Sequence, residues 1–440
     1  MMEKSRLEAT VGFGLNLVNG CLERGHPKLM ATEGFYLAAE GSRLHLQDSR
    51  YRYAVACYSM ELPEKYIHTY DYAPEQLWGT YDGDNLQSGF QEGDYVFGRR
   101  CYFRLCLRRV DGETITSAEA EKLGEIMTCS SMARRREPKI FAEEIRQVAD
   151  KVQGLRQSDD LVLALLTDTH ATVNGTWQDT AANLQALQKK VHFDGIVHLG
   201  DLTDGTVSRD MTNFYVASML EDIQKLAVPV HIVLGNHDAN YFHGNPEVMP
   251  LHEQAGLYQA GAARWKQEAD RTYYYVDYPQ QCLRCLYLSA YDNEARPRYG
   301  FDLTQIAWVR ETLAAVPEDW RVMVFAHDAP LPELDPWSEE IRNGRLMMQA
   351  LESCQAQLLV YIHGHAHADF VYHHKGRKEF PIIALGCAKC EDMAERKVAG
   401  SFTPARFLGE ATQELWDILI IKKSGKLHFI RFGAGHDRSV

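Results

Sequence analysis

The sequence predicts two parts of different fold class: an all-β part at the N-terminus, followed by a larger α/β part. Before residue 110, short segments such as 51–58 and 103–107 alternate apolar and polar positions and are rich in aromatic residues, which is typical of half-buried strands. After residue 160, short apolar runs alternate with longer helical patterns. This second pattern is typical of strands that are buried on both faces by helices.

Residues 1–130 are expected to form an accessory domain of the sandwich or jelly-roll kind. Its aromatic side chains allow two interpretations. We expect them to fill the interior of the domain, because aromatic residues commonly dominate β cores. The alternative is a binding platform for a carbohydrate or a protein partner. The residues that would form such a platform are Tyr70, Trp78 and Tyr81, with Asp71, Glu75, Asp82 and Asp84 beside them.

Residues 131–158 are polar at first and then helical over 141–155, so we expect a helical linker there. The α/β domain is predicted to span 159–440. Its expected strands are 161–166, 195–199, 229–234, 322–325 and 358–362, and its expected helices are 178–190, 209–225 and 303–313.

The composition and the net charge argue against some classes of partner. The chain has 440 residues, with 47 Lys and Arg against 60 Asp and Glu, which gives a net charge of −13. This balance makes polymeric nucleic acid and anionic membranes poor partners, because both attract basic surfaces. The ten cysteines are unevenly spaced, as is usual in a reducing compartment. We see no signal peptide or membrane-spanning run and expect a cytoplasmic protein.

Polar blocks follow five of the predicted strands, at the end where α/β folds bind their ligands. The blocks are 167–170, 200–205, 235–238, 326–328 and 363–367, and they read Thr-Asp-Thr-His, Gly-Asp-Leu-Thr-Asp-Gly, Gly-Asn-His-Asp, Ala-His-Asp and His-Gly-His-Ala-His. A lone Asp-x-His or His-x-His is a weak signal, whereas Gly-Asn-His-Asp is a stronger one. Five such blocks in order along the chain indicate a functional site.

The residue types in these blocks suit metal ions. In an extended segment, residues two apart project to the same side, so Asp168 and His170, and likewise His365 and His367, are expected to point into one cavity. Carboxylate, amide and imidazole groups together suit Mn²⁺, Fe²⁺ or Fe³⁺, and Zn²⁺. A carboxylate can also bridge two such ions, an arrangement that clamps a phosphoryl group.

The five blocks match Asp-x-His, Gly-Asp-x-x-Asp/Asn, Gly-Asn-His-Asp/Glu, a single His and Gly-His-x-His. In this the sequence resembles the calcineurin-like metallophosphoesterase superfamily over about residues 160–440, with a pattern most similar to bacterial members of the cyclic-nucleotide phosphodiesterase type. The resemblance implies a four-layer α/β/β/α sandwich. It also implies two divalent metal ions that generate a bridging hydroxide for in-line attack on phosphorus.

The resemblance also assigns roles to matched positions. It implies that Asp168, His170, Asp201 and His367 hold one metal ion, and that Asp201, Asn236, His327 and His365 hold the other. His237 would be the general acid, kept cationic by Asp204 behind it. The expected function is hydrolysis of a small phosphodiester or phosphomonoester. The alternatives are a nuclease that acts on nucleic-acid ends, and a catalytically idle metal-binding scaffold whose N-terminal domain binds a partner.

Two further sets of residues have uncertain roles. Polar residues in the loops after the motifs could line the entrance to the site, although ordinary loop surface is the favoured interpretation for each one alone. They are Asn174, Tyr241, His243, Arg296, Arg298 and Tyr299. Two Cys-x-x-Cys pairs, Cys282 with Cys285 and Cys387 with Cys390, could form a zinc site, but buried apolar cysteines are the expectation.

Overall fold

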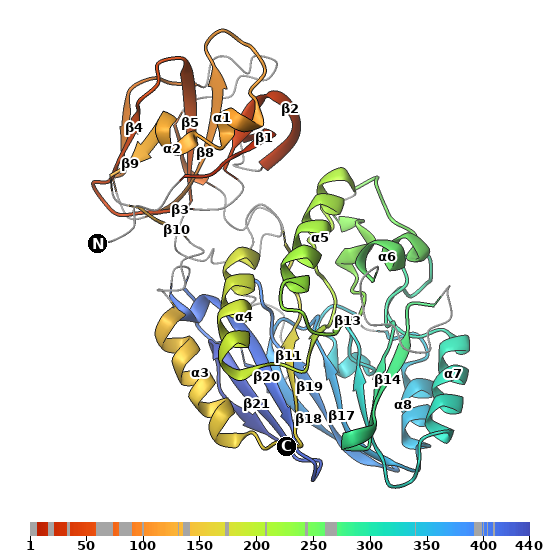
Figure 1. The fold of residues 1–440 in the computed structure, drawn as a ribbon. Helices are drawn as coiled ribbons and strands as arrows, with labels where there is room; N and C mark the ends of the chain where they lie inside the picture. Colours follow the sequence, from red (N-terminus) through yellow and green to blue (C-terminus); the bar gives the residue numbers. More distant parts are fainter. Residues whose placement is uncertain are drawn as a thin grey trace. The chain divides into compact units, whose positions relative to one another are not determined.

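The computed structural model divides the chain into two compact units, the first made almost wholly of residues up to Ile140 and the second almost wholly of residues from Phe141 onward (Figure 1). The structure describes residues 7–15, 22–32, 36–58, 74–78, 90–98, 101–130, 132–134, 141–171, 176–206, 209–242, 245–259, 271–338, 340–390, 398, 400–402, 404–407 and 410–440.

The first unit is rich in strands, as predicted, and contains a larger and a smaller sheet. The larger sheet consists of β1 (Thr10–Leu15), β2 (Leu22–Ala31), β8 (Cys101–Arg109), β3 (Tyr36–Ala38) and β10 (Met132–Arg134), with β5 (Tyr51–Tyr58) and β6 (Pro74–Trp78) attached through β8. The smaller sheet consists of β7 (Asp94–Val96), β4 (Arg43–Leu46) and β9 (Met127–Cys129). Two short helices, α1 (Ser117–Ala120) and α2 (Leu123–Ile126), precede β9.

Aromatic residues of the first unit fill its interior at several positions. Tyr53, Phe97 and Phe103 are fully buried in one apolar cluster. At the edge of this cluster, the Tyr51 hydroxyl donates a hydrogen bond to Glu119, which also accepts one from Arg109, each at 2.7 Å. The residues of the alternative binding platform are outside the described part of the chain, apart from the backbone of Glu75 and Trp78 in β6. They are Tyr70, Asp71, Tyr81, Asp82 and Asp84, with the side chains of Glu75 and Trp78.

The second unit contains two mixed sheets and the helices around them, so its predicted α/β character is confirmed. The first sheet has the order β13 (Val230–Ile232), β12 (Gly195–His198), β11 (Leu161–Leu166), β20 (Leu415–Ile421), β21 (Leu427–Gly433), β22 (Arg438–Ser439). The second has the order β14 (Tyr274–Tyr278), β15 (Leu283–Tyr287), β16 (Arg321–Phe325), β17 (Gln357–His363), β19 (Glu379–Leu385), β18 (Asp369–Lys375). The helices are α3 (Ala142–Leu155), α4 (Trp177–Val191), α5 (Arg209–Gln224), α6 (Leu251–Tyr258), α7 (Leu303–Ala314) and α8 (Gly344–Glu352).

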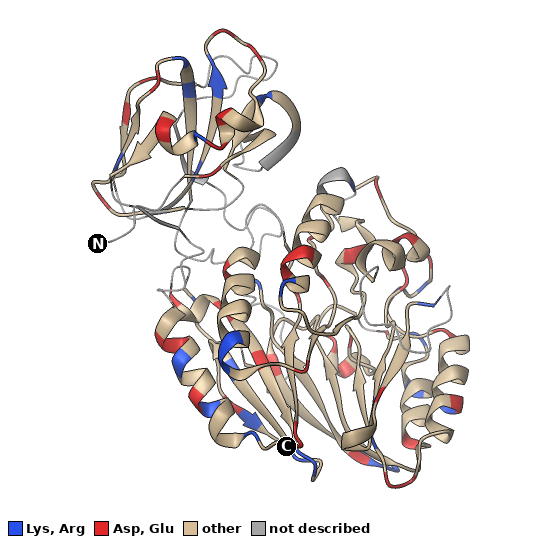
Figure 2. Cartoon of the chain, viewed as in Figure 1, with Lys and Arg blue, Asp and Glu red and all other residues tan. Residues whose placement is uncertain are grey.

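Apolar side chains from both sheets form one core between them. Leu163 and Val197 of the first sheet share a cluster with Phe325 and Ile362 of the second. A separate cluster joins the second sheet to α7 and α8. Figure 2 shows that charged residues lie along the helices, whereas the strands between them carry few. The full four-layer order stays a prediction.

Helix α3 belongs to the second unit and not to a free linker. Its buried residues Ile145, Val148 and Val152 form one face of the helix, which contacts β20 and β21. The expected range 131–158 therefore does not match the division between the units, because burial of this apolar face stabilises α3 against the sheet.

Parallel pairing sets the position of the functional loops. Strands β11, β12 and β13 run parallel in the first sheet, and β15, β16, β17 and β19 run parallel in the second. Within each sheet the C-terminal ends of these strands share an edge, and the polar blocks follow at that edge. No helix in the described part of the chain combines the length and the apolar character needed to span a membrane.

Candidate metal centre

The loops that carry the polar blocks adopt a left-handed backbone at five positions. The φ angles are 52° at Asp168, 40° at His170, 53° at Asp201, 59° at His365 and 50° at His367. The expectation of an extended backbone at the two paired positions is therefore wrong. Left-handed residues other than glycine are uncommon and cost on the order of 1 kcal/mol each, so their clustering marks a functional site.

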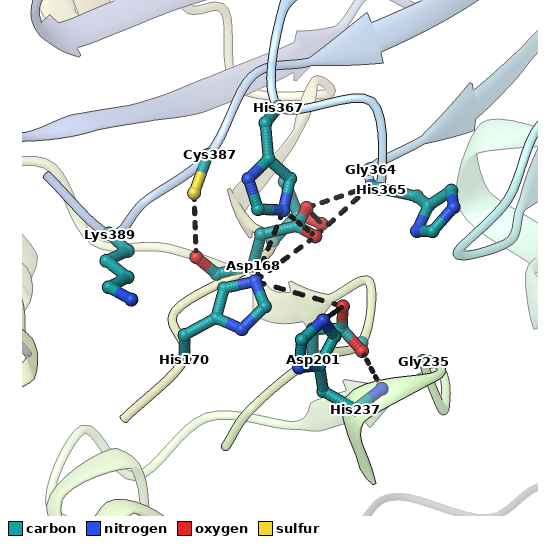
Figure 3. Close-up of polar contacts among 12 residues, drawn as sticks. Asp168, His170, Asp201, Gly235, His237, Gly364, His365, His367, Cys387 and Lys389 are labelled. Carbon is teal, nitrogen blue, oxygen red and sulfur yellow. Dashed lines mark hydrogen bonds and ion pairs between the residues drawn. The ribbon is translucent and has the colours of Figure 1, made fainter. Parts of the chain in front are cut away.

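The first donor group consists of Asp168, His170, Asp201 and His367, all buried (Figure 3). One ligand atom from each lies within 4.8 Å of the others. His170 Nε2 is 3.2 Å from His367 Nε2, and His367 Nε2 is 3.1 Å from Asp168 Oδ1. Two imidazole nitrogens and two carboxylates thus converge on one point.

The second donor group contains Asp201 again, with His327 and His365, again within 4.8 Å of one another. His327 Nε2 is 3.1 Å from Asp201 Oδ2 and 3.0 Å from Asn236 Oδ1. His327 Nδ1 donates to the carbonyl of Leu199 at 2.8 Å. The opposite nitrogen, Nε2, faces the centre between two acceptor oxygens; burial opposes the charged form, but Asp201 raises the pKa of His327 well above its usual range, so a cation bound here would take the place of the Nε2 proton.

The donor groups fit divalent cations. Asp201 Oδ2 makes no hydrogen bond in the described part of the chain, and neither does His365 Nε2, although both residues are buried. Burial opposes ionisation of Asp201, but the neighbouring His327, His237 and His170 hold its pKa well below its usual range. Buried anionic oxygen and imidazole nitrogen without hydrogen bonds are donors that a cation satisfies. The clusters are therefore compatible with a metal centre.

Glycines of the motifs allow the loops to approach closely. A Cβ at Gly235 would overlap the carboxylate of Asp201, and a Cβ at Gly364 would overlap Asp168. Asp238 fixes the same region because its carboxylate accepts hydrogen bonds from the backbone N–H groups of Asp201 and Gly235 at 3.0 and 2.9 Å. Burial and the nearby Asp201 raise the pKa of Asp238 to about 8.

His237 lies beside the first donor group, but its environment differs from the expected one. Its Nδ1 donates to the backbone carbonyl of Asp204 at 2.6 Å, so Nε2 faces Asp201 Oδ2 at 3.9 Å. The Asp204 carboxylate lies instead 3.3 Å from His170 Nδ1 and 3.9 Å from Lys389 Nζ. Burial lowers the pKa of His237 to about 3, against the attraction of Asp201. The charge of Asp204 favours the cationic form of His237, but the effect of burial is larger.

The predicted entrance residues separate into distinct groups. Tyr241 stacks near Tyr291 and under the guanidinium of Arg298, and Tyr299 lies between Tyr291 and His365. The exposed Arg296 instead donates to carbonyls of its own loop, those of Asn293 and Ala295. Asn174 and His243 lie outside the described residues.

Tyr291 also lines a cavity of about 390 Å³. Arg271, Asp292 and Arg342 contribute charged groups to its walls, and Ser289 and Thr272 contribute hydroxyl groups. Ser289 follows β15, so the cavity lies near the strand ends that also carry the metal centre. Its size is within the usual range for a small-molecule site.

Sequence reasoning missed several buried polar residues around the centre. His365 Nε2 lies 3.4 Å from Asp328 Oδ1 and 3.6 Å from Asp335 Oδ1. Lys389 is buried beside Asp204. Asp328 is the last residue of the fourth polar block, which was a usable signal, whereas Asp335 and Lys389 reach the centre only through the fold.

The two Cys-x-x-Cys pairs do not form a common metal site. Among the described residues, no group of potential metal ligands contains Cys282, Cys285 or Cys390, whereas Cys387 lies near His170 and His367. Cys285 is buried in β15, and Cys282 precedes that strand with a left-handed φ of 48°.

Comparison with known proteins agrees with the motifs. Residues 161–369, just under half of the chain, match the family described as calcineurin-like phosphoesterase. A dimetal phosphatase from Danio rerio is 14% identical, with 64% of this chain and 98% of that chain covered and a TM-score of 0.47. A phosphopantetheinyl hydrolase from Mycobacterium tuberculosis is 11% identical, with 52% and 91% covered and a TM-score of 0.35. No curated protein matches the chain.

The family match and the donor groups agree in position, because the match begins with β11 and extends through the last motif. The second unit thus matches the calcineurin-like phosphoesterase family over residues 161–369, and this match supports a metal-dependent phosphoesterase.

Proposed function

We propose that the chain hydrolyses a small phosphodiester or phosphomonoester with two divalent cations. The observation that carries the proposal is that Asp201 belongs to both donor groups. One shared carboxylate between two sets of nitrogen and oxygen donors is the arrangement of dinuclear phosphoesterases. In this proposal Asp168, His170, Asp201 and His367 hold one cation, and Asp201, Asn236, His327 and His365 hold the other.

When bound, the cations would supply an activated water and would neutralise the phosphate oxygens. The protein residues orient these groups. His327 presents Nε2 because Leu199 accepts its Nδ1 proton, and Asp168 is held by the backbone N–H of His365 at 3.0 Å. His237 stays the proposed general acid; the role requires a proton on Nε2, the ring nitrogen that faces Asp201, in addition to the Nδ1 proton that the Asp204 carbonyl accepts.

The substrate class is supported by the surroundings of the centre. Tyr241, Tyr299 and Arg298 lie together beside His365, and the cavity near Tyr291 suits a small molecule. We propose that this side receives the ester group of the substrate. A cyclic-nucleotide substrate and a cytoplasmic location stay predictions from the sequence.

The test is reconstitution of metal-free protein with Mn²⁺, Fe²⁺ or Zn²⁺. Metal content is measured with hydrolysis of cyclic nucleotides, linear diesters, nucleoside monophosphates, sugar phosphates and single-stranded DNA. We expect about two metal ions per chain and activity on a small ester. Asp201→Asn should reduce both, whereas the exposed control Asp319→Asn should change neither.

Three results would decide against the proposal. Binding of two metal ions without hydrolysis of any ester would favour the metal-binding scaffold. Hydrolysis confined to DNA would favour the nuclease. If Asp201→Asn had the same metal content and activity as the wild type, the shared carboxylate would not be needed to hold the cations.

A further inference from the structure

The cavity beside Tyr291 contains an arginine whose side chain makes no hydrogen bond to any described residue. Arg342 lines this cavity, which has a volume of about 390 Å³. Its side chain is 22% exposed, and its Nε is buried without a hydrogen-bond partner. Its ion pair with Asp292 is 3.8 Å long, which is beyond hydrogen-bond distance. Buried polar groups usually form hydrogen bonds, so a guanidinium without them in a cavity wall indicates a ligand.

The backbone of Arg342 is fixed without any contribution from the guanidinium. Its N–H donates to the carbonyl of Tyr299 at 2.9 Å, and its carbonyl accepts from the N–H of Phe301 at 2.8 Å. Gly300 lies between these two residues with a φ of 120°, and a Cβ there would overlap the Arg342 backbone. The two segments therefore approach closely through glycine. A change of the Arg342 side chain should leave this contact in place.

The rest of the wall supplies further hydrogen-bond donors. Thr272 and Ser289 are buried and contribute hydroxyl groups. Gln305 of α7 fixes Ser289, because it accepts from the Ser289 N–H at 2.9 Å and donates to the Ser289 carbonyl at 2.7 Å. This contact brings the N-terminus of α7 to the cavity, where Thr304 lines the wall. The first N–H groups of a helix have no partner within the helix and attract anions.

Two carboxylates also line the cavity, and both are already held by backbone N–H groups. Asp292 Oδ1 accepts from an N–H of its own turn at 2.9 Å, and Asp302 Oδ1 accepts from an N–H in the first turn of α7 at 2.6 Å. Arg271 contributes a second guanidinium, which balances the second carboxylate. The forked N–H donors of Arg342 therefore stay available for an oxyanion, whose geometry matches a guanidinium.

We propose that this cavity binds an oxyanion, a phosphate or carboxylate group, on the guanidinium of Arg342 and the hydroxyl groups of Thr272 and Ser289. The site goes beyond the proposed function, because none of these residues belongs to a donor group of the metal centre and no metal ion is needed.

The proposed oxyanion site nevertheless borders the metal centre. The ring of Tyr291, in the cavity wall, lies 5.4 Å from that of Tyr299, and the ring of Tyr299 lies 5.0 Å from that of His365, measured between centroids. The oxyanion can therefore belong to a substrate as a second anionic group, or it can be a separate small anion.

The test is calorimetric titration of full-length, metal-free protein with inorganic phosphate and, separately, with succinate. We expect wild-type protein to bind at least one of these anions. Arg342→Met should weaken the binding at least about tenfold, because charged hydrogen bonds to the anion are lost. Ser289→Ala removes one neutral donor and should weaken it about two- to tenfold. The control Arg345→Met changes an exposed arginine of α8 and should bind as the wild type does.

Wild-type protein that binds neither anion would overturn the proposal, and so would equal affinity in Arg342→Met. Because metal is absent from these titrations, both results would leave the proposed hydrolysis intact. Circular dichroism shows whether Arg342→Met is folded. If it is not, Ser289→Ala decides, and an affinity equal to that of the wild type would then overturn the proposal.

Competition identifies the source of the oxyanion. Nucleoside monophosphates and sugar phosphates are added to wild-type protein that already holds the anion. Displacement of the bound anion would show that the site takes an anionic group of such an ester. Absence of displacement would show that it takes a separate small anion. Both results support the site and differ only in its occupant.

Discussion

Arg431 on β21 is predicted to be a major source of stability in the second unit. Its side chain is 2% exposed and pairs with Asp417 Oδ1 at 3.0 Å and with Asp369 Oδ1 at 2.9 Å. Asp417 belongs to β20 of the first sheet and Asp369 to β18 of the second, so the guanidinium links the two sheets. Arg431→Met would leave two buried carboxylates with Arg438 as their remaining arginine, at 2.8 and 3.2 Å.

Removal of one partner from a buried ion pair costs about 3 to 5 kcal/mol, and the retained Arg438 places this case near the lower end. We expect the free energy of unfolding to fall by about 3 kcal/mol in denaturant titrations followed by tryptophan fluorescence. The control Arg345→Met changes an exposed arginine of α8 and should shift stability by less than about 0.5 kcal/mol. A loss below about 1 kcal/mol in Arg431→Met would refute the reasoning.

Three further changes test other parts of the molecule. Gly364→Ala adds a Cβ that overlaps Asp168. We expect the free energy of unfolding to fall by about 1 to 3 kcal/mol and the metal content, measured by mass spectrometry, to decrease. An unchanged stability and metal content would contradict the overlap. Lys389→Met leaves the buried Asp204 carboxylate without its lysine and should cost about 3 kcal/mol in the same titrations, and a neutral result would show that this pair is dispensable. Burial favours the neutral form of Glu119, but hydrogen bonds to its carboxylate outweigh burial and lower its pKa to about 2. Its contribution to the stability of the folded protein is therefore complete above the unfolded pKa near 4.5 and is lost as pH falls toward 2. Glu119→Gln should remove that part of the acid sensitivity, which denaturation at about pH 6 and about pH 3 would measure, and an unchanged pH dependence would exclude this carboxylate as its source.

The elements of the second unit could be predicted because their signals are local. The apolar run 161–166 coincides with β11, and the helical pattern 178–190 differs from α4 by one residue at each end. Burial on both faces produces the continuous apolar runs, and helices keep their amphipathic period, so neighbouring residues suffice to identify both.

The site was predictable only in part. The motif residues that the sequence analysis selected do converge, because strand ends in a parallel sheet share an edge. The direction of individual side chains was not predictable, since the left-handed backbone at Asp168 and His365 depends on contacts between loops. The same holds for the Asp204 carboxylate, which faces His170 and not His237, and for Cys387, whose position is set by pairing with the first motif loop.

The candidate metal centre takes its donors from both sheets of the second unit. Asp168 and Asp201 follow strands of the first sheet, whereas His327 and His367 follow strands of the second. Cations bound there would hold only the folded arrangement of the sheets, and a ligand at one hundred times its dissociation constant adds about 2.7 kcal/mol to stability. The supply of metal would then set how much of the protein stays folded, so that metal starvation would lower its abundance as well as its activity.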